Sequence, residues 1–135
     1  MQRVIEWNGV ERETGMQIAV CCPGEQESEW ICRMIEARAG ETRRNAQAVS
    51  FLREAELWAA FAPGKFRGAV VGWGDVQGFL CARRLREEDG GCGIVLLDDS
   101  ERYAIRSLRI HAADFLTRPL EESRFLAAVD RLLGT

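Results

Sequence analysis

The chain has 135 residues, of which 47% are hydrophobic and 29% are charged, and its formal net charge at pH 7 is -3. This size and composition are typical of one compact globular domain and argue against a second folded domain. The net negative charge and the scattered basic residues argue against direct nucleic-acid contact, and no apolar stretch approaches the ~20 residues that span a membrane.

The amino terminus and the cysteines indicate the compartment. The first residues, MQRVIEWNGVERETG, lack the basic segment followed by an apolar segment that marks a signal peptide, so we expect a cytoplasmic protein. An odd number of cysteines without a Cys-x-x-Cys pair predicts reduced thiols, not a disulfide framework or a zinc site. These cysteines are Cys21, Cys22, Cys32, Cys81 and Cys92.

Residues 1–15 fit the pattern of the remaining chain poorly. Asn8-Gly9 lies between strand-like flanks, which predicts a β-hairpin. The alternative is that Met16 is the natural start, because the codons for residues 11–13 would be purine-rich and could form a ribosome-binding site. Both remain open, and we divide the chain into an N-terminal extension (1–15) and one domain (16–135).

From residue 16 onward, short apolar runs alternate with amphipathic stretches. This alternation predicts an α/β domain in which helices cover both faces of a parallel sheet. The expected strands are residues 17–21, 44–51, 68–72, 93–97 and 113–117. Helices are expected near residues 26–38, 54–62 and 76–86, from a cap at Asp98-Asp99-Ser100 to about His111, and after Pro119 with Phe125, Val129, Leu132 and Leu133 buried.

The residues that follow the strands define a candidate site. In an open parallel sheet, ligands bind outside the carboxyl ends of the strands. Cys22-Pro23 follows the first expected strand and Gly72 ends the third. Asp98 and Arg118 follow the fourth and the fifth. We therefore expect these side chains around one crevice.

Residues 16–135 resemble the receiver domain of two-component response regulators, and look most like receivers that precede LytTR-type DNA-binding domains. The most specific matches are Tyr103 near the start of the fourth helix, the small-small-Asp-aromatic turn 112–115, and Arg118-Pro119. The resemblance implies a flavodoxin-like fold, in which a doubly wound five-stranded parallel sheet has helices on both faces. It also implies a cis peptide bond before Pro119.

The resemblance also implies a chemistry that this sequence has lost. Receivers accept a phosphoryl group on an Asp after strand three, and acidic residues after strand one help to hold Mg²⁺. A hydroxyl residue and a Lys contact the phosphate. These positions read Gly72, Cys22-Pro23, Asp98 and Arg118 here, and a thiol, a proline and a glycine cannot supply the hard oxygen ligands of Mg²⁺.

The sequence therefore predicts a degenerate receiver, or pseudo-receiver, without enzymatic activity, metal or cofactor, that acts in signal transduction through protein contacts. One alternative is a phosphorylatable receiver that uses Asp75 as a displaced acceptor. A remote alternative is a small redox or nucleotide-binding protein of flavodoxin-like fold. Within the crevice, Arg118 and Asp98 either form a permanent ion pair or both point to water, and Trp73 either packs down or stays exposed.

The resemblance places the signalling surface on the fourth helix, fifth strand and fifth helix. In the family, an aromatic residue on strand five swings inward on phosphorylation, and its counterpart here is Phe115. Because Phe115 has no hydroxyl, we expect burial to hold it inward and to favour one state permanently. The expected contact surface, for a second copy or another protein, consists of Tyr103, Arg106, Ile110, Asp114 and Arg118.

Overall fold

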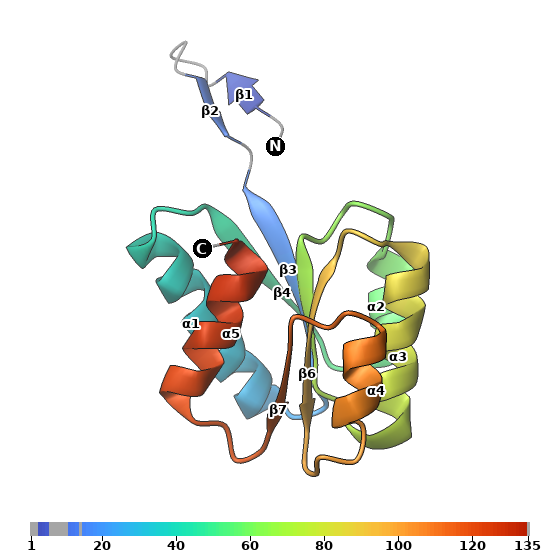
Figure 1. Cartoon of the computed structure of the whole chain (residues 1–135). Coiled ribbons are helices and arrows are strands. Elements are labelled where there is room, and N and C mark those ends of the chain that lie inside the picture. Colours follow the sequence, from blue (N-terminus) through green and yellow to red (C-terminus); the bar gives the residue numbers. More distant parts are fainter. Residues whose placement is uncertain (1–2, 6–10, 14, 135) are drawn as a thin grey trace.

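The computed structural model describes residues 3–5, 11–13 and 15–134 (Figure 1). Strands and helices alternate from β3 onward. The strands of the main sheet are β3 (Met16–Cys21), β4 (Ala46–Phe51), β5 (Gly68–Val71), β6 (Gly93–Asp98) and β7 (Asp114–Thr117). The helices are α1 (Glu25–Glu41), α2 (Glu54–Ala60), α3 (Asp75–Glu88), α4 (Ala104–Arg109) and α5 (Glu122–Leu133).

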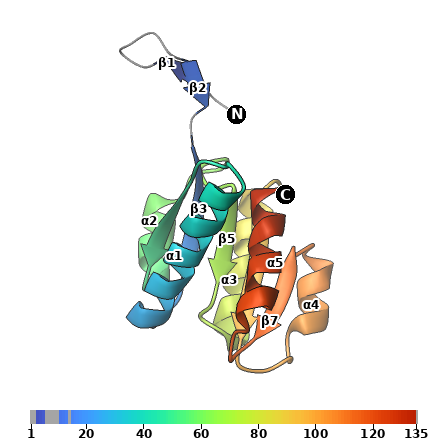
Figure 2. The ribbon, with the colours of Figure 1, turned by 90° about the vertical axis from the view of Figure 1, so that its left-hand side faces the viewer.

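The main sheet is entirely parallel, with the strand order β4-β3-β5-β6-β7. Helices α1 and α5 cover one face, and α2, α3 and α4 cover the other (Figures 1 and 2). The predicted fold class, a doubly wound flavodoxin-like sheet, is confirmed. Because β4 lies on one side of β3 and β5 on the other, the strand order reverses between β3 and β5, where this fold opens its crevice.

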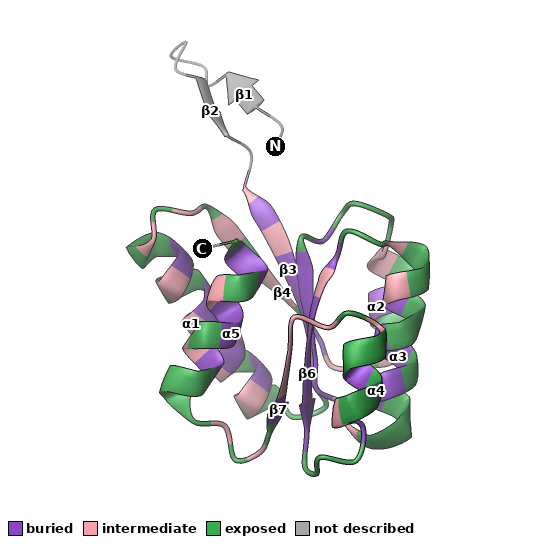
Figure 3. Ribbon diagram, viewed as in Figure 1, coloured by how far each residue is buried: buried purple, intermediate pink, exposed green. Residues whose placement is uncertain are grey.

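Successive side chains of the inner strands point to opposite faces of the sheet and pack into two separate cores. Val20, Val70 and Leu97 point into the core beneath α1 and α5, whereas Ala69 and Ile94 point into the core beneath α2 and α3. Figure 3 shows buried residues along β6 and on the helix faces that turn toward the sheet. The predicted burial of one face of α5 is confirmed, since Phe125, Val129, Leu132 and Leu133 are at most 2% exposed.

Helix α4 begins later than the sequence predicts. Its N-cap is Tyr103, without a side-chain cap, so the predicted cap at residues 98–100 is wrong. Asp98 is instead the last residue of β6, and the hydroxyl of Ser100 accepts a hydrogen bond from the backbone N–H of Arg102 at 3.4 Å. These polar side chains stabilise the turn between β6 and α4 rather than the first turn of the helix.

At the amino terminus, β1 (Arg3–Ile5) pairs antiparallel with β2 (Glu11–Glu13). The predicted turn at Asn8-Gly9 lies outside the described residues, and the division of the chain at residue 15 remains a prediction. Within the described ranges, none of the helices has the length and apolar character required to cross a bilayer.

Two facing glycines let α5 pack closely on the sheet. Gly68 and Gly93 are register partners on β5 and β6. A Cβ atom on Gly68 would lie 2.9 Å from Leu132 Cδ2 and 3.2 Å from the backbone oxygen of Gly93. A Cβ atom on Gly93 would lie 3.0 Å from the same Leu132 atom.

We expect Gly68→Ala to lower the free energy of unfolding by about 1–3 kcal/mol, because the added methyl group would crowd both Leu132 of α5 and the backbone oxygen of Gly93. Gly40→Ala is the control, since no atom lies within 4 Å of the new Cβ on α1 and alanine favours a helix by about 0.5–1 kcal/mol over glycine. Urea unfolding of both variants measures the difference. Equal effects of the two substitutions would contradict this account of the α5 packing.

Candidate functional site

Cys22 and Gly72 form the floor of the crevice at the carboxyl ends of β3 and β5. Cys22 is fully buried, and the N–H of Gly72 donates a hydrogen bond to Cys21 O at 2.6 Å. A Cβ atom at position 72 would lie 2.8 Å from Cys22 Sγ and 2.9 Å from Arg118 Nη2. The structure therefore brings Cys22, Gly72 and Arg118 together and leaves no free space for a side chain at position 72, whereas Pro23 is exposed.

The guanidinium of Arg118 lies over this floor. Its Nη2 donates hydrogen bonds to Gly72 O and to Glu27 Oε1, both at 2.7 Å. Its Nε donates to Glu27 Oε2 at 2.9 Å, so the pair with Glu27 is bidentate, which is the strong geometry for an arginine–carboxylate contact. Nη1 contacts Asp99 Oδ1 at 3.3 Å. The predicted cis peptide bond between Arg118 and Pro119 is confirmed.

Asp98 is not the partner of Arg118, so the predicted ion pair is wrong, and so is the alternative that both side chains point to water. Asp98 is 6% exposed. Its Oδ2 accepts a hydrogen bond from the backbone N–H of Asp75 at 2.9 Å, and its Oδ1 accepts one from the N–H of Asp99 at 2.7 Å. A carboxylate at the start of α3 is favoured by the partial positive charge of the helix terminus.

Glu27 is the residue of the crevice that the sequence did not reveal. It lies in the first turn of α1, which also carries Glu25. Acidic residues are common in the first turn of any helix because of the helix dipole. The sequence therefore offers no signal that separates Glu27, which binds Arg118, from Glu25, which is exposed.

Burial and nearby charges determine the protonation states of Cys22 and Arg118 in the crevice. Burial is the largest cause that raises the pKa of Cys22 to about 12, and the negative charge of Glu27 adds to it, while Arg118 opposes it. Hydrogen bonds to Glu27 raise the pKa of Arg118. The thiol is therefore neutral and the guanidinium charged at neutral pH. In the described part of the chain, no three His, Cys, Asp or Glu side chains are grouped to hold a metal ion.

Trp73 lies on the loop beyond Gly72, and Asp75 begins the helix that follows. Asp75 is the first residue of α3, and its carboxylate is 68% exposed and contacts Arg102 Nη1 at 3.5 Å. Trp73 packs against the core beneath α2 and α3, and its Nε1 donates a hydrogen bond to Leu52 O at 3.3 Å. The expectation that Trp73 packs down is therefore confirmed, and an exposed Trp73 is wrong.

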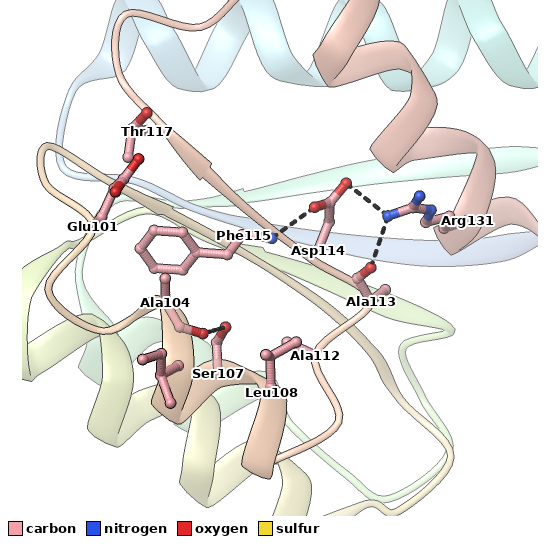
Figure 4. A pocket seen from close by; sticks show the side chains of 11 residues that line it. Glu101, Ala104, Ser107, Leu108, Ala112, Ala113, Asp114, Phe115, Thr117 and Arg131 are labelled. Carbon is pink, nitrogen blue, oxygen red and sulfur yellow. Dashed lines mark hydrogen bonds and ion pairs between the residues drawn. The ribbon is translucent and has the colours of Figure 1, made fainter.

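A second hollow, of about 470 Å³, lies between α4 and β7 (Figure 4). Phe115 lines it and is partly buried against the core beneath α2 and α3, and its role as a switch residue remains a prediction. On α4, Ile105 and Leu108 are each 70% exposed, while the intervening Ser107 is 1% exposed and donates a hydrogen bond to Ala104 O. The short helix thus turns a polar residue inward and two large apolar residues outward.

Asp114 is held at the edge of this hollow by two arginines of α5. Arg124 Nη2 donates to Asp114 Oδ1 at 2.8 Å, and Arg131 Nη1 donates to Oδ2 at 3.0 Å. Burial favours the neutral form of Asp114, but the hydrogen bonds from Arg124 and from the N–H of Phe115, together with the two positive charges, outweigh it and lower its pKa. Asp114 therefore ties β7 to α5.

The structure does not gather the five predicted contact residues on one surface. Tyr103 is 5% exposed and stacks on Phe79, so it contributes little exposed surface of its own. Arg118 points into the crevice and Asp114 toward α5, while Tyr103, Arg106 and Ile110 line a groove between α3 and α4. Ile105 and Leu108 were not predicted as contact residues from the sequence, because an apolar pair on a helix is usually assigned to the core.

Solved structures that share this fold include response regulators and their receiver domains. The CheY-like receiver domain protein from Methanospirillum hungatei JF-1 has a TM-score of 0.73 and 13% sequence identity, and the match covers 90% of this chain and 95% of that one. An orphan response regulator of H. pylori has a TM-score of 0.69 and 11% identity over 87% of this chain and 96% of that one.

Response regulator DrrB, a Thermotoga maritima OmpR/PhoB homolog, has a TM-score of 0.67 and 18% identity over 90% of this chain, which spans 54% of the length of DrrB. By sequence, no family model and no curated protein matches the chain. The likeness to receiver domains is thus confirmed for the fold, and the relation to LytTR-type receivers remains a prediction.

Removing the guanidinium should open the crevice floor to water. Burial is the larger cause of the raised pKa of Cys22. We therefore expect water entry in Arg118→Ala to lower this pKa by more than the loss of the positive charge raises it. In the wild type, a pKa of about 12 leaves roughly one Cys22 thiol in 10,000 ionised at pH 8. We expect alkylation of Cys22 by iodoacetamide to be about tenfold faster or more in the variant, as measured by peptide mass spectrometry.

The control for this experiment is Arg33→Ala on the exposed face of α1. Cys22 should react as slowly in this variant as in the wild type. An unchanged rate in Arg118→Ala would show that Arg118 does not cover the floor.

Proposed function

We propose that residues 16–135 form a pseudo-receiver, a degenerate receiver domain that acts in two-component or phosphorelay signal transduction by binding a protein and not by accepting a phosphoryl group. One observation carries the proposal. The guanidinium of Arg118, paired with Glu27, lies against Gly72, which is the position of the acceptor Asp in the receivers that this sequence resembles.

The charges around the crevice support this proposal. Two carboxylates, those of Glu27 and Asp99, already contact the guanidinium of Arg118, and Asp98 ends β6 at the same edge of the sheet. A phosphoryl group would add negative charge beside them, and like charges a few ångströms apart repel strongly in a partly buried site. Its entry would also break the bidentate pair and leave Glu27 without its partner, which is costly for a partly buried carboxylate.

The proposed contact surface is the face formed by α4, β7 and α5, with Ile105 and Leu108 at its centre. Large exposed apolar side chains beside a hollow are typical of protein contact sites. With Phe115 packed inward, the domain would present this face in one permanent arrangement. A second copy of the chain is the first occupant to test, and a cytoplasmic partner protein is the other.

Incubation with acetyl phosphate and Mg²⁺ tests the absence of phosphoryl transfer. We expect no gain of a phosphoryl mass in intact-protein mass spectrometry, because position 72 has no acceptor and the crevice is negatively charged. The DrrB receiver domain, whose BeF3-activated form has been solved, is a suitable reference protein for the same assay. A mass gain that disappears in Asp75→Asn would replace our proposal with the displaced-acceptor receiver.

Bound flavin or nucleotide in the purified protein would instead favour the redox or nucleotide-binding class. Absorbance spectra and mass spectrometry of the denatured protein detect either ligand.

Ile105→Glu tests the contact surface. We expect a dimer of the wild type in sedimentation velocity, and a weakening of dimerisation by about tenfold or more in the variant, because a charge replaces a large apolar side chain at the contact. Ala37→Glu, on the exposed face of α1, adds the same charge elsewhere and should leave the dimer intact. A wild type that stays monomeric at high concentration would exclude the second copy as occupant.

A further inference from the structure

A separate groove of about 390 Å³ lies between α3 and α4, which run side by side in Figure 1. Its floor is the stacked pair Phe79 and Tyr103, whose ring centroids are 5.4 Å apart at an interplanar angle of 17°. Both rings are at most 9% exposed. The groove thus has a buried, stacked aromatic base.

One wall of the groove exposes apolar side chains. Val76 and Leu80 lie one helical turn apart on α3 and are 51% and 44% exposed. Ile110, after the end of α4, also lines the groove. Apolar side chains that remain in water beside a preformed hollow would gain free energy if a partner covered them.

Arginines line the remaining sides. Arg83 comes from α3, and Arg106 and Arg109 come from α4. Arg106 lies over the ring of Tyr103, with its guanidinium carbon 5.3 Å from the centroid. Two acidic residues of α3 are already paired, since Glu87 contacts Arg83 at 3.7 Å and Asp75 contacts Arg102 at 3.5 Å.

Within the residues that the structure describes, Arg106 and Arg109 form no ion pair, and both side chains are exposed. The groove therefore combines an apolar wall with an uncompensated positive rim. Such a surface favours a ligand that carries apolar side chains and carboxylates together, because opposite charges add selectivity to apolar burial.

We propose that this groove binds an acidic amphipathic helix of a partner protein. The apolar face of that helix covers Val76, Leu80 and Ile110, and its carboxylates pair with Arg106 and Arg109. This site goes beyond the proposed function, because α4 separates it from the hollow that Ile105 and Leu108 border. It does not depend on whether the crevice accepts a phosphoryl group.

Selection from a random library of peptides of about 16 residues, displayed on phage, tests this proposal. The whole protein is the bait, and the charge-reversed variant Arg106→Glu/Arg109→Glu is used for counter-selection. We expect enriched peptides that carry apolar residues three or four positions apart, flanked by Asp and Glu. In fluorescence anisotropy, the charge-reversed variant should bind them about tenfold more weakly or worse than the wild type.

The matched control is Arg33→Glu/Arg43→Glu, which makes the same change in net charge at exposed positions away from the groove and should bind like the wild type. Leu80→Ser tests the apolar wall and should also weaken binding. Amide chemical-shift changes on peptide addition should cluster at Val76, Leu80 and residues 106–110. A selection without enrichment, enriched peptides that bind both double variants equally, or shifts confined to Ile105, Leu108 and Phe115 would each overturn the proposal.

Discussion

The contact between Arg118 and Glu27 organises the carboxyl edge of the sheet. It joins the segment after β7 to the first turn of α1, and through Gly72 O it reaches the end of β5. A partly buried guanidinium is stable only when its N–H groups are bonded, and here each nitrogen of the group has an acceptor. The guanidinium leaves no space for a side chain at position 72, and Glu27 adds to the burial that keeps the thiol of Cys22 neutral.

The sequence was sufficient to predict the fold because inner parallel strands are continuous apolar runs that are easy to identify. Runs such as GIVLL are buried on both faces, and the amphipathic helices between them leave little doubt about the order of elements. The weak point was α4, where the six helical residues carry no clear apolar stripe and the turn before them is rich in capping residues. Boundaries that depend on such short segments are decided by tertiary contacts and not by propensity.

The sequence allowed us to predict which residues meet at the candidate site, but not which hydrogen bonds and ion pairs they form. Residues that follow parallel strands must meet at one edge, so Cys22, Gly72 and Arg118 could be placed together in advance. The partner of Arg118 could not, because Glu27 is 91 residues away in the chain and approaches only when α1 packs on the sheet. Likewise, Tyr103 is an expected surface residue until its stacking on Phe79 is known.

The tight floor at Gly72 has an evolutionary consequence. A single substitution that introduces a carboxylate there would clash with both Cys22 and Arg118, and displacing Arg118 would break its ion pair with Glu27. A Gly72→Asp substitution on its own is therefore expected to make the protein less stable. A carboxylate at this position is expected to be tolerated in evolution only together with replacements at Cys22 and Arg118.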